Sequence, residues 1–225
     1  MYIIGIDLSG PANTKDTSVA AFREYGRKLS LKNHFEHASD QIILDLAREI
    51  LSSSNLIVGL DAPLSYNPGG GDRPGDKKLR KLIVKKGMSP GSIMPPTMTR
   101  MAYLTLRGIT IARLLENIET KKSLTIAEVH PGAAMVLRAA DLNSIKKMKK
   151  SKRAKRELLV WLETQGLSGL PNAESVSDHF IAACACVLAV WNWHSGNPKW
   201  MEPANLPHHP YGVRVWGRCL PFKAS

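Results

Sequence analysis

The chain has 225 residues, which fits one domain and is long enough to bury a hydrophobic core. Its 31 Lys and Arg residues against 19 Asp and Glu residues give a net charge of +12, a balance that favours polyanionic partners, with nucleic acid first. The 44% hydrophobic content excludes extensive disorder, and the absence of a long apolar run and of a secretory signal pattern predicts a cytoplasmic protein with no membrane segment.

The first part of the chain is predicted to be a meander followed by a helix and a further strand. Three β-rich runs predict successive antiparallel strands, at 2–7, 17–22 and 29–35. Apolar residues follow helical spacing over 40–51, where Ser39 or Asp40 can cap the first turn. This helix leads into a fourth strand at 56–60.

After a loop dense in Pro and Gly, helices predominate. They are predicted at 76–86, 97–120, 131–140, 157–163 and 177–193. A fifth strand is predicted at 124–128, and the lysine-rich run 146–156 is interpreted as a loop that leads into a helix. The last helix is apolar nearly all round, so it should be buried against the sheet with Cys184 and Cys186 as reduced thiols.

Parallel strands require crossover connections, and the runs at 56–60 and 124–128 each follow a helical stretch. We therefore expect a mixed five-stranded α/β sheet with the strand order 3-2-1-4-5, flanked by helices. Residues 62–122 would form a helical insertion after the fourth strand. A Pro- and His-rich tail, 197–225, with a possible edge strand at 212–216, would complete a single domain of residues 1–225.

Acidic residues end three strands that should be neighbours: Asp7, Asp61 and Glu128. Neighbouring strands lie about 4.8 Å apart, so the three carboxylates would meet at one edge and need a cation or raised pKa values. Asp178, in the first turn of the last helix, would be the fourth acid. Hard oxygen ligands suit Mg²⁺ or Mn²⁺, and two such ions about 3.5–4 Å apart can hold a phosphodiester for hydrolysis. Taken singly, Asp7 and Asp61 could instead cap the turns that follow their strands, and Asp178 could be a negative charge that the helix dipole favours.

Six motifs together resemble the DUF429 family, whose members are described as RNase H-like nucleases. They are GIDLSGP at 5–11, GLDAPLSY at 59–66, RPGDKKLRKL at 73–82, the PP-T-R segment at 95–100, EVHPGAAM at 128–135 and SDHFIAACA at 177–185. The resemblance implies an RNase H-like fold, with the family's acids at Asp7, Asp61, Glu128 and Asp178. In one departure, Ser175 stands where the family often has an acid, and whether neighbouring Glu174 substitutes is open.

Basic residues supply candidate substrate contacts: Arg73, Arg80, Arg100 and Arg107. Their guanidinium groups could fork onto phosphate, although a capping Asp76 with solvated basic neighbours is the alternative for the first two. His130 could be a metal ligand, a proton shuttle or a turn residue, while His179 is expected to point away from Asp178. The run 146–156 could grip a phosphate backbone or be a solvated segment.

The sequence thus predicts a nuclease that depends on Mg²⁺ or Mn²⁺ and hydrolyses the phosphodiester bonds of DNA or RNA. One alternative is an actin-like or sugar-kinase-like phosphotransferase that uses ATP. Such enzymes usually contain two copies of this domain and Gly-rich phosphate loops, of which Ser9-Gly10 is only a weak example. The other alternative is a nucleic-acid-binding protein that has the fold without catalysis.

Overall fold

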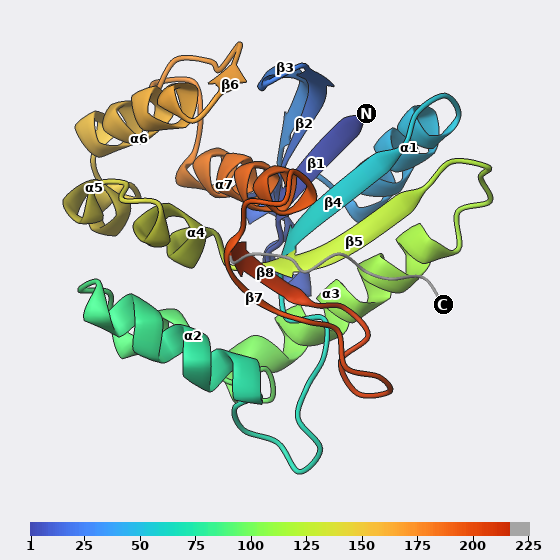
Figure 1. The fold of residues 1–225 in the computed structure, drawn as a ribbon, viewed down its shortest axis with the longest axis vertical. Coiled ribbons are helices and arrows are strands. Elements are labelled where there is room, and N and C mark those ends of the chain that lie inside the picture. Colours follow the sequence, from blue (N-terminus) through green and yellow to red (C-terminus); the bar gives the residue numbers. More distant parts are fainter. Residues whose placement is uncertain (217–225) are drawn as a thin grey trace.

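The computed structural model describes residues 1–216, and at its centre lies one mixed sheet of eight strands (Figure 1). The strands are β1 (Tyr2–Asp7), β2 (Ser18–Tyr25), β3 (Lys28–Glu36), β4 (Leu56–Asp61), β5 (Leu124–Val129), β6 (Leu167–Ser168), β7 (Lys199–Glu202) and β8 (Val213–Trp216). They follow the order β6-β3-β2-β1-β4-β5-β8-β7. The predicted mixed sheet flanked by helices is confirmed, but five strands was too few, because β6, β8 and β7 extend the sheet beyond β3 and β5.

Seven α-helices and two 3-10 helices connect these strands within the described residues. The α-helices are α1 (Asp40–Leu51), α2 (Pro74–Lys85), α3 (Thr99–Glu116), α4 (Pro131–Leu137), α5 (Leu142–Lys147), α6 (Lys152–Thr164) and α7 (Asp178–His194), and the 3-10 helices are η1 (Pro11–Asp16) and η2 (Pro90–Ser92). The lysine-rich run 146–156 is more helical than expected: it supplies the end of α5 and the start of α6. Ser151 allows this, because its hydroxyl accepts a hydrogen bond from the Ala154 amide at 3.2 Å and so caps α6.

The C-terminal strands correct one prediction. The run at 212–216 was expected at an edge of the sheet, yet β8 pairs in parallel with β5 and antiparallel with β7. The edge position falls instead to β7, which the sequence did not predict as a strand.

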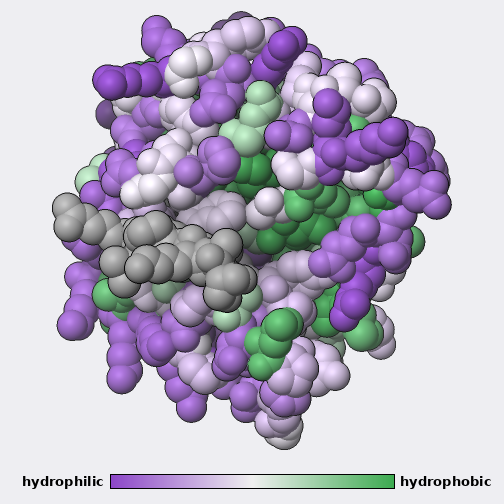
Figure 2. All heavy atoms as spheres, turned by 45° about the vertical axis from the view of Figure 1, so that its right-hand side comes forward, coloured by the Kyte–Doolittle hydropathy of each residue, from purple (hydrophilic) through white to green (hydrophobic). Residues whose placement is uncertain are grey.

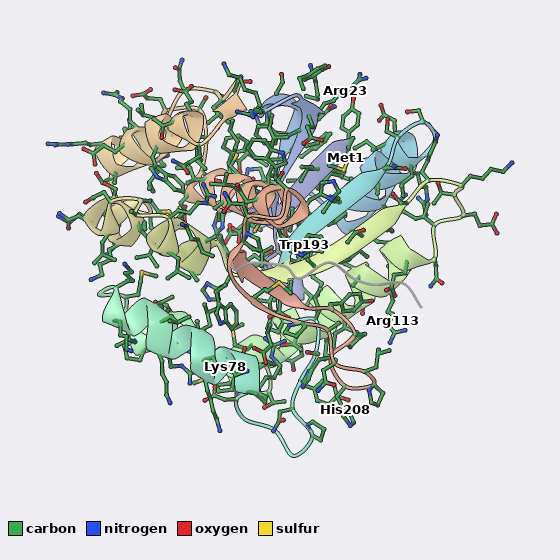
Figure 3. The ribbon with its side chains drawn as sticks, viewed as in Figure 1. Met1, Arg23, Lys78, Arg113, Trp193 and His208 are labelled. Carbon is green, nitrogen blue, oxygen red and sulfur yellow. The ribbon has the colours of Figure 1, made fainter. Side chains whose placement is uncertain are left out.

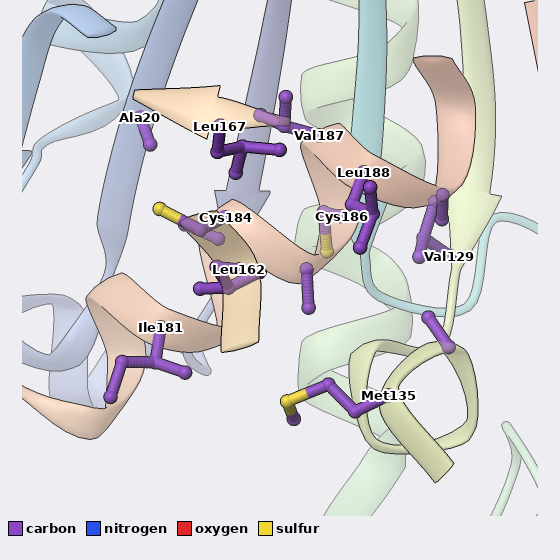
Figure 4. Packing of buried hydrophobic residues seen from close by; sticks show 14 of the residues in the cluster. Ala20, Val129, Met135, Leu162, Leu167, Ile181, Cys184, Cys186, Val187 and Leu188 are labelled. Atoms are coloured by element: carbon purple, nitrogen blue, oxygen red, sulfur yellow. The ribbon is translucent and has the colours of Figure 1, made fainter. Parts of the chain in front are cut away.

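Side-chain alternation along the strands divides the interior into two hydrophobic cores. Ile4, Ile6, Val58 and Leu60 pack with α1 and α3 on one face. Ile3, Ile57, Ala127 and Val129 belong to the second core, with α7 and α4 (Figures 1 and 4).

Helix α7 is buried along nearly its whole length, as its apolar sequence predicts. Cys184 and Cys186 are fully buried free thiols, and burial raises the pKa of both well above the ordinary value. Both thiols point into the packed core that Figure 4 shows beside Val187 and Leu188. These cysteines therefore contribute packing rather than reactivity.

Two glycines bring α7 close to the sheet. A Cβ on Gly5 would lie 2.0 Å from the Ala183 carbonyl oxygen, and one on Gly59 would lie 2.9 Å from the Cys186 carbonyl oxygen. The helix backbone therefore packs directly on β1 and β4, which no side chain at these positions would permit. This close approach sets the N-terminus of α7 beside the carboxyl ends of the two strands.

The substitution Gly5→Ala is expected to lower the free energy of unfolding by about 1–3 kcal/mol, because the added methyl group collides with helix backbone. Urea denaturation would measure the loss. Gly10→Ala is the matched control, because Gly10 has φ −65° and no atom within 4 Å of an added Cβ. This substitution should leave the free energy of unfolding unchanged or raise it by up to about 1 kcal/mol. Equal stability of the two variants would contradict the close packing of α7.

One face of the molecule can be seen in full atomic detail in Figure 2. The face in Figure 2 is largely hydrophilic around a smaller apolar area. Among the described residues, no helix combines the length and the apolar character that a membrane crossing requires.

Candidate active site

Asp7 and Asp61 end the two central parallel strands at the same level. Their Cα atoms are register partners in the β1–β4 pair, so both side chains emerge on the α7 face of the sheet. Burial, the negative charge of Asp7 and, more weakly, that of Glu128 raise the pKa of Asp61 well above the ordinary value. Two neighbouring carboxyls in a desolvated position create a demand for a proton or a cation.

These two carboxyls lie in a cleft of about 440 Å³, which we call the acid cleft. Its lining comes from the strand ends, the segment around η2, the start of α4, α5 and the start of α7. The residues are Asp7, Asp61, Met88, Ser89, Ser92, His130, Pro131, Gly132, Ile145, Lys146, Met148, Lys149, Asp178, His179 and Ala182. The cleft therefore combines three carboxylates with two lysines.

Asp178 reaches the acid cleft from the first turn of α7. The Ser177 hydroxyl caps this helix by accepting a hydrogen bond from the Phe180 amide at 3.1 Å. Ser177 also donates its hydroxyl and its amide to the Glu36 carboxylate, at 2.7 and 2.9 Å, which ties the start of α7 to β3. The negative charge of Asp178 is favoured at this helix end by the dipole.

His179 is a site residue that the sequence interpretation missed. Its Nδ1 lies 2.6 Å from the Asp7 Oδ2, and this hydrogen bond raises the pKa of the imidazole, although partial burial opposes the shift. The sequence predicts only that the His179 side chain points away from Asp178, whereas in the structure His179 on α7 contacts Asp7 on β1. Nothing in the local sequence reports such a contact, but an aspartate followed by a histidine at the start of a buried helix was a usable signal.

Glu128 is not in the acid cleft, which corrects the expectation that four acids meet there. In the β4–β5 pair its register partner is Leu60, one residue before Asp61. Because successive side chains in a strand point to opposite faces, Glu128 leaves β5 on the face opposite Asp7 and Asp61, although it lines a smaller neighbouring cavity of about 70 Å³ together with Asp61. Val129, a core residue, takes the position level with Asp61.

Glu128 instead forms a buried ion pair with Arg73. The Arg73 Nη2 donates to Oε1 at 2.5 Å and Nη1 to Oε2 at 2.7 Å, and the Leu64 amide donates to the same Oε2 at 2.8 Å. Arg73 also donates to both carboxylate oxygens of Asp76 and to the Ser65 hydroxyl. Burial alone would lower the pKa of Arg73, but the Glu128 and Asp76 carboxylates raise it, so the guanidinium stays charged.

The sequence did contain a sign of this register. Gly5 and Gly59 are register partners, and Ala127 is level with Gly59. If these three small residues are aligned because one helix packs across them, the residues two positions later are Asp7, Asp61 and Val129. Glu128 then falls out of line by one residue, and its side chain must point to the other face.

None of the four predicted substrate-binding arginines lines the acid cleft. Arg73 is buried in the ion pair with Glu128. Arg80 donates to both Asp72 carboxylate oxygens at 2.6 Å, and Arg107 is buried against Asp40 and the Ser9 carbonyl. Arg100 is exposed near the start of α3. In this structure, three of the four therefore stabilise the fold and are not free to bind phosphate.

Two further candidates have defined places. His130 lines the acid cleft, donates from Nε2 to the Ser92 carbonyl at 2.7 Å, and has a lowered pKa because it is buried. The imidazole is therefore neutral near pH 7. Glu174 pairs with Arg156 at 2.9 Å on the surface and does not line the cleft. In this arrangement it does not replace the acidic residue that the family often has at the position of Ser175.

The donor atoms of the acid cleft are of the kind that hard divalent ions prefer. Asp7, Asp61 and Asp178 supply carboxylate oxygens, and the paired charges at Asp7 and Asp61 would be balanced by Mg²⁺ or Mn²⁺. Among residues 1–216, no three His, Cys, Asp or Glu side chains are already arranged as a metal-binding group. Glu128 already accepts hydrogen bonds at both oxygens from Arg73 and the Leu64 amide, so its charge is compensated by a guanidinium without a metal ion.

Comparison with known proteins agrees with the motifs at the strand ends. The model of one family, described as a protein of unknown function (DUF429), matches residues 5–206. No curated protein matches the chain. The match includes all or part of every strand except β8, the three aspartates of the acid cleft and the Arg73–Glu128 pair. The chain therefore belongs to the DUF429 family.

Proposed function

We propose that this protein is a nuclease that hydrolyses phosphodiester bonds with Mg²⁺ or Mn²⁺ bound in the acid cleft. The observation that carries the proposal is the pair of register-matched aspartates, Asp7 and Asp61, in the same cleft as Asp178 and two lysines. Cleavage of nucleic acid that requires both the metal and the Asp7 carboxylate tests it.

An RNase H-like topology is part of the same proposal. What supports it is the antiparallel β1–β2–β3 meander, followed by β4 and β5 parallel to β1. In such a sheet the first and fourth strands carry acids at their carboxyl ends, and a late helix brings another acid to them. Here α7 has that role.

Asp7, Asp61 and Asp178 would hold the metal ions, while Glu128 would hold Arg73. Bound divalent ions would lower the pKa of a coordinated water and stabilise the charge of the leaving oxygen. The hydrogen bond from His179 fixes the orientation of the Asp7 carboxylate. Lys146 and Lys149 supply positive charge for the substrate phosphates next to the scissile bond.

In a metal-free buffer, Asp61→Asn is expected to raise the melting temperature at pH 7 by about 2–4 °C, which corresponds to roughly 1 kcal/mol in a chain of this size. The raised pKa of Asp61 means that the folded state disfavours its ionised form. This cost is absent below the unfolded pKa of about 3.9, grows as pH rises, and is complete above the folded pKa. The stabilisation should therefore vanish near pH 3.

Added Mn²⁺ should raise the melting temperature of the parent protein and leave that of Asp61→Asn almost unchanged. Asp45→Asn, a change at an exposed surface pair on α1, is the control and should respond to Mn²⁺ as the parent does. If Mn²⁺ stabilises the parent and Asp61→Asn equally, the acid cleft is not the metal site.

A further inference from the structure

Lysines from two elements flank the opening of the acid cleft. Lys146 and Lys149 line it on the side of α5, and Lys85 and Lys86 end α2 just before Met88, which lines the cleft from the other direction. All four lysines are exposed. In the described part of the chain, none of their ammonium groups pairs with a carboxylate.

Some other basic residues nearby do pair with carboxylates. Lys78, on the same helix α2 (Figure 3), pairs with Glu202 at 2.8 Å. Arg153 and Arg156 on α6 each pair with a glutamate, at 2.8 and 2.9 Å. Uncompensated positive charge therefore stands where the cleft opens, next to three carboxylates, and the exposed Lys147 and Lys150 beside it extend that charge over the neighbouring surface.

The cleft is narrow. A Cβ on Gly87, just after α2, would lie 2.7 Å from the Leu142 Cδ2 at the start of α5, so the elements on its two sides are in contact there. The cleft volume is about 440 Å³, and the Asp7 side chain at its base is only 13% exposed. A single strand is thinner than a duplex, so it fits carboxylates that are recessed in this way better than a duplex does.

Within residues 1–216, the cleft has no large aromatic ring on which a base could stack, and its two imidazoles already bond to protein groups, His130 to the Ser92 carbonyl and His179 to Asp7. Among its lining residues in the described part of the chain there is no Phe, Tyr or Trp, and the apolar contacts come from Met88, Ile145 and Met148. Single-strand binding proteins that stack bases use such rings. Binding here should depend on the phosphate backbone and show little sequence preference.

We propose that the acid cleft binds single-stranded nucleic acid, with Lys146 and Lys149 on successive phosphates of one strand. This inference rests on the proposed function, because it takes the strand to the same three carboxylates. Lys146 lies in the last turn of α5 and Lys149 in the turn that follows the helix, and both line the cleft. Lys85 and Lys86 would contact the strand where it leaves the cleft.

Fluorescence anisotropy in EDTA tests the inference through binding alone. The probes are labelled single-stranded DNA and RNA oligonucleotides of mixed sequence and a duplex hairpin with the same number of nucleotides. We expect the single strands to bind at least about 10-fold more tightly than the hairpin. In Lys146→Gln/Lys149→Gln, single-strand affinity should fall about 10-fold, and the slope of log K against log salt should decrease by about 1.4.

Lys121→Gln/Lys122→Gln is the matched control, because this exposed pair precedes the N-terminal end of β5, whereas the acid cleft lies at the carboxyl ends of β1 and β4. It should bind as the parent does. Equal binding of hairpin and single strand, or equal losses in the two double variants, would overturn the inference. Selective single-strand binding without cleavage would support the single-strand inference and count against the nuclease proposal. Equal cleavage of duplex and single strand would support the nuclease proposal and count against the single-strand inference.

Discussion

Asp7→Asn is expected to reduce metal-dependent cleavage by about 10³-fold or more while the protein remains folded. Asp7 is one of two acids in register at the base of the acid cleft, and asparagine removes one of the three carboxylate charges that would hold the ions. Metal ions contribute several kcal/mol to such reactions, and each tenfold in rate corresponds to about 1.4 kcal/mol. Cleavage of labelled DNA and RNA, with Mg²⁺, with Mn²⁺ and with EDTA, measures the loss.

The controls separate a failed site from a failed fold. Urea denaturation should show Asp7→Asn to be as stable as the parent or more so. Asp45→Asn, which changes an exposed carboxylate on α1, should cleave at the parental rate. If Asp7→Asn cleaves as well as the parent, the site is wrongly assigned, and if the parent cleaves no substrate with either metal, the nuclease proposal fails.

Arg73→Met is expected to lower the free energy of unfolding by about 3–5 kcal/mol. The guanidinium is 6% exposed and compensates two buried carboxylates, Glu128 and Asp76. Methionine fills part of the space but leaves both acids without a cation. In a chain of this length the melting temperature should fall by about 10 °C at neutral pH. Calorimetry and urea denaturation both measure the change.

Arg153→Met supplies the comparison at an exposed ion pair. Arg153 is 89% exposed and pairs with Glu157 one helical turn away, so its loss should cost about 0.5 kcal/mol or less. Glu128→Gln distinguishes a structural role of Glu128 from metal binding. If Glu128 only compensates Arg73, the variant should lose stability and still bind Mn²⁺. A Glu128→Gln variant with parental stability and no response to Mn²⁺ would return Glu128 to the metal site.

The local pattern of the sequence was enough to locate most elements of the central sheet. Apolar runs marked β1, β4 and β5, helical spacing marked α1, and the all-apolar α7 was recognisable as a buried helix. β6, β7 and β8 were missed or misplaced for a common reason. Each is short, and pairing with distant strands rather than intrinsic preference holds it in the sheet.

The candidate site divides in the same way. Asp7, Asp61 and Asp178 could be selected from sequence, because strand ends and helix starts are local features and the crossover rule brings them together. Glu128 was assigned wrongly and His179 was missed, since the register of β5 decides which face Glu128 occupies and the packing of α7 decides what His179 contacts. A shift of one residue reverses the direction of every side chain in a strand.

The sequence by itself therefore determined the class of the sheet, the buried helix and the three aspartates of the acid cleft. Only the tertiary structure decided that Arg73 and Glu128 neutralise each other in the interior, that His179 holds Asp7, and that the unpaired lysines stand at the opening. The physical reason is that strand ends, caps and helical periodicity are encoded by neighbouring residues. Register, ion pairing and cleft shape depend on residues that meet across more than 50 positions of the chain.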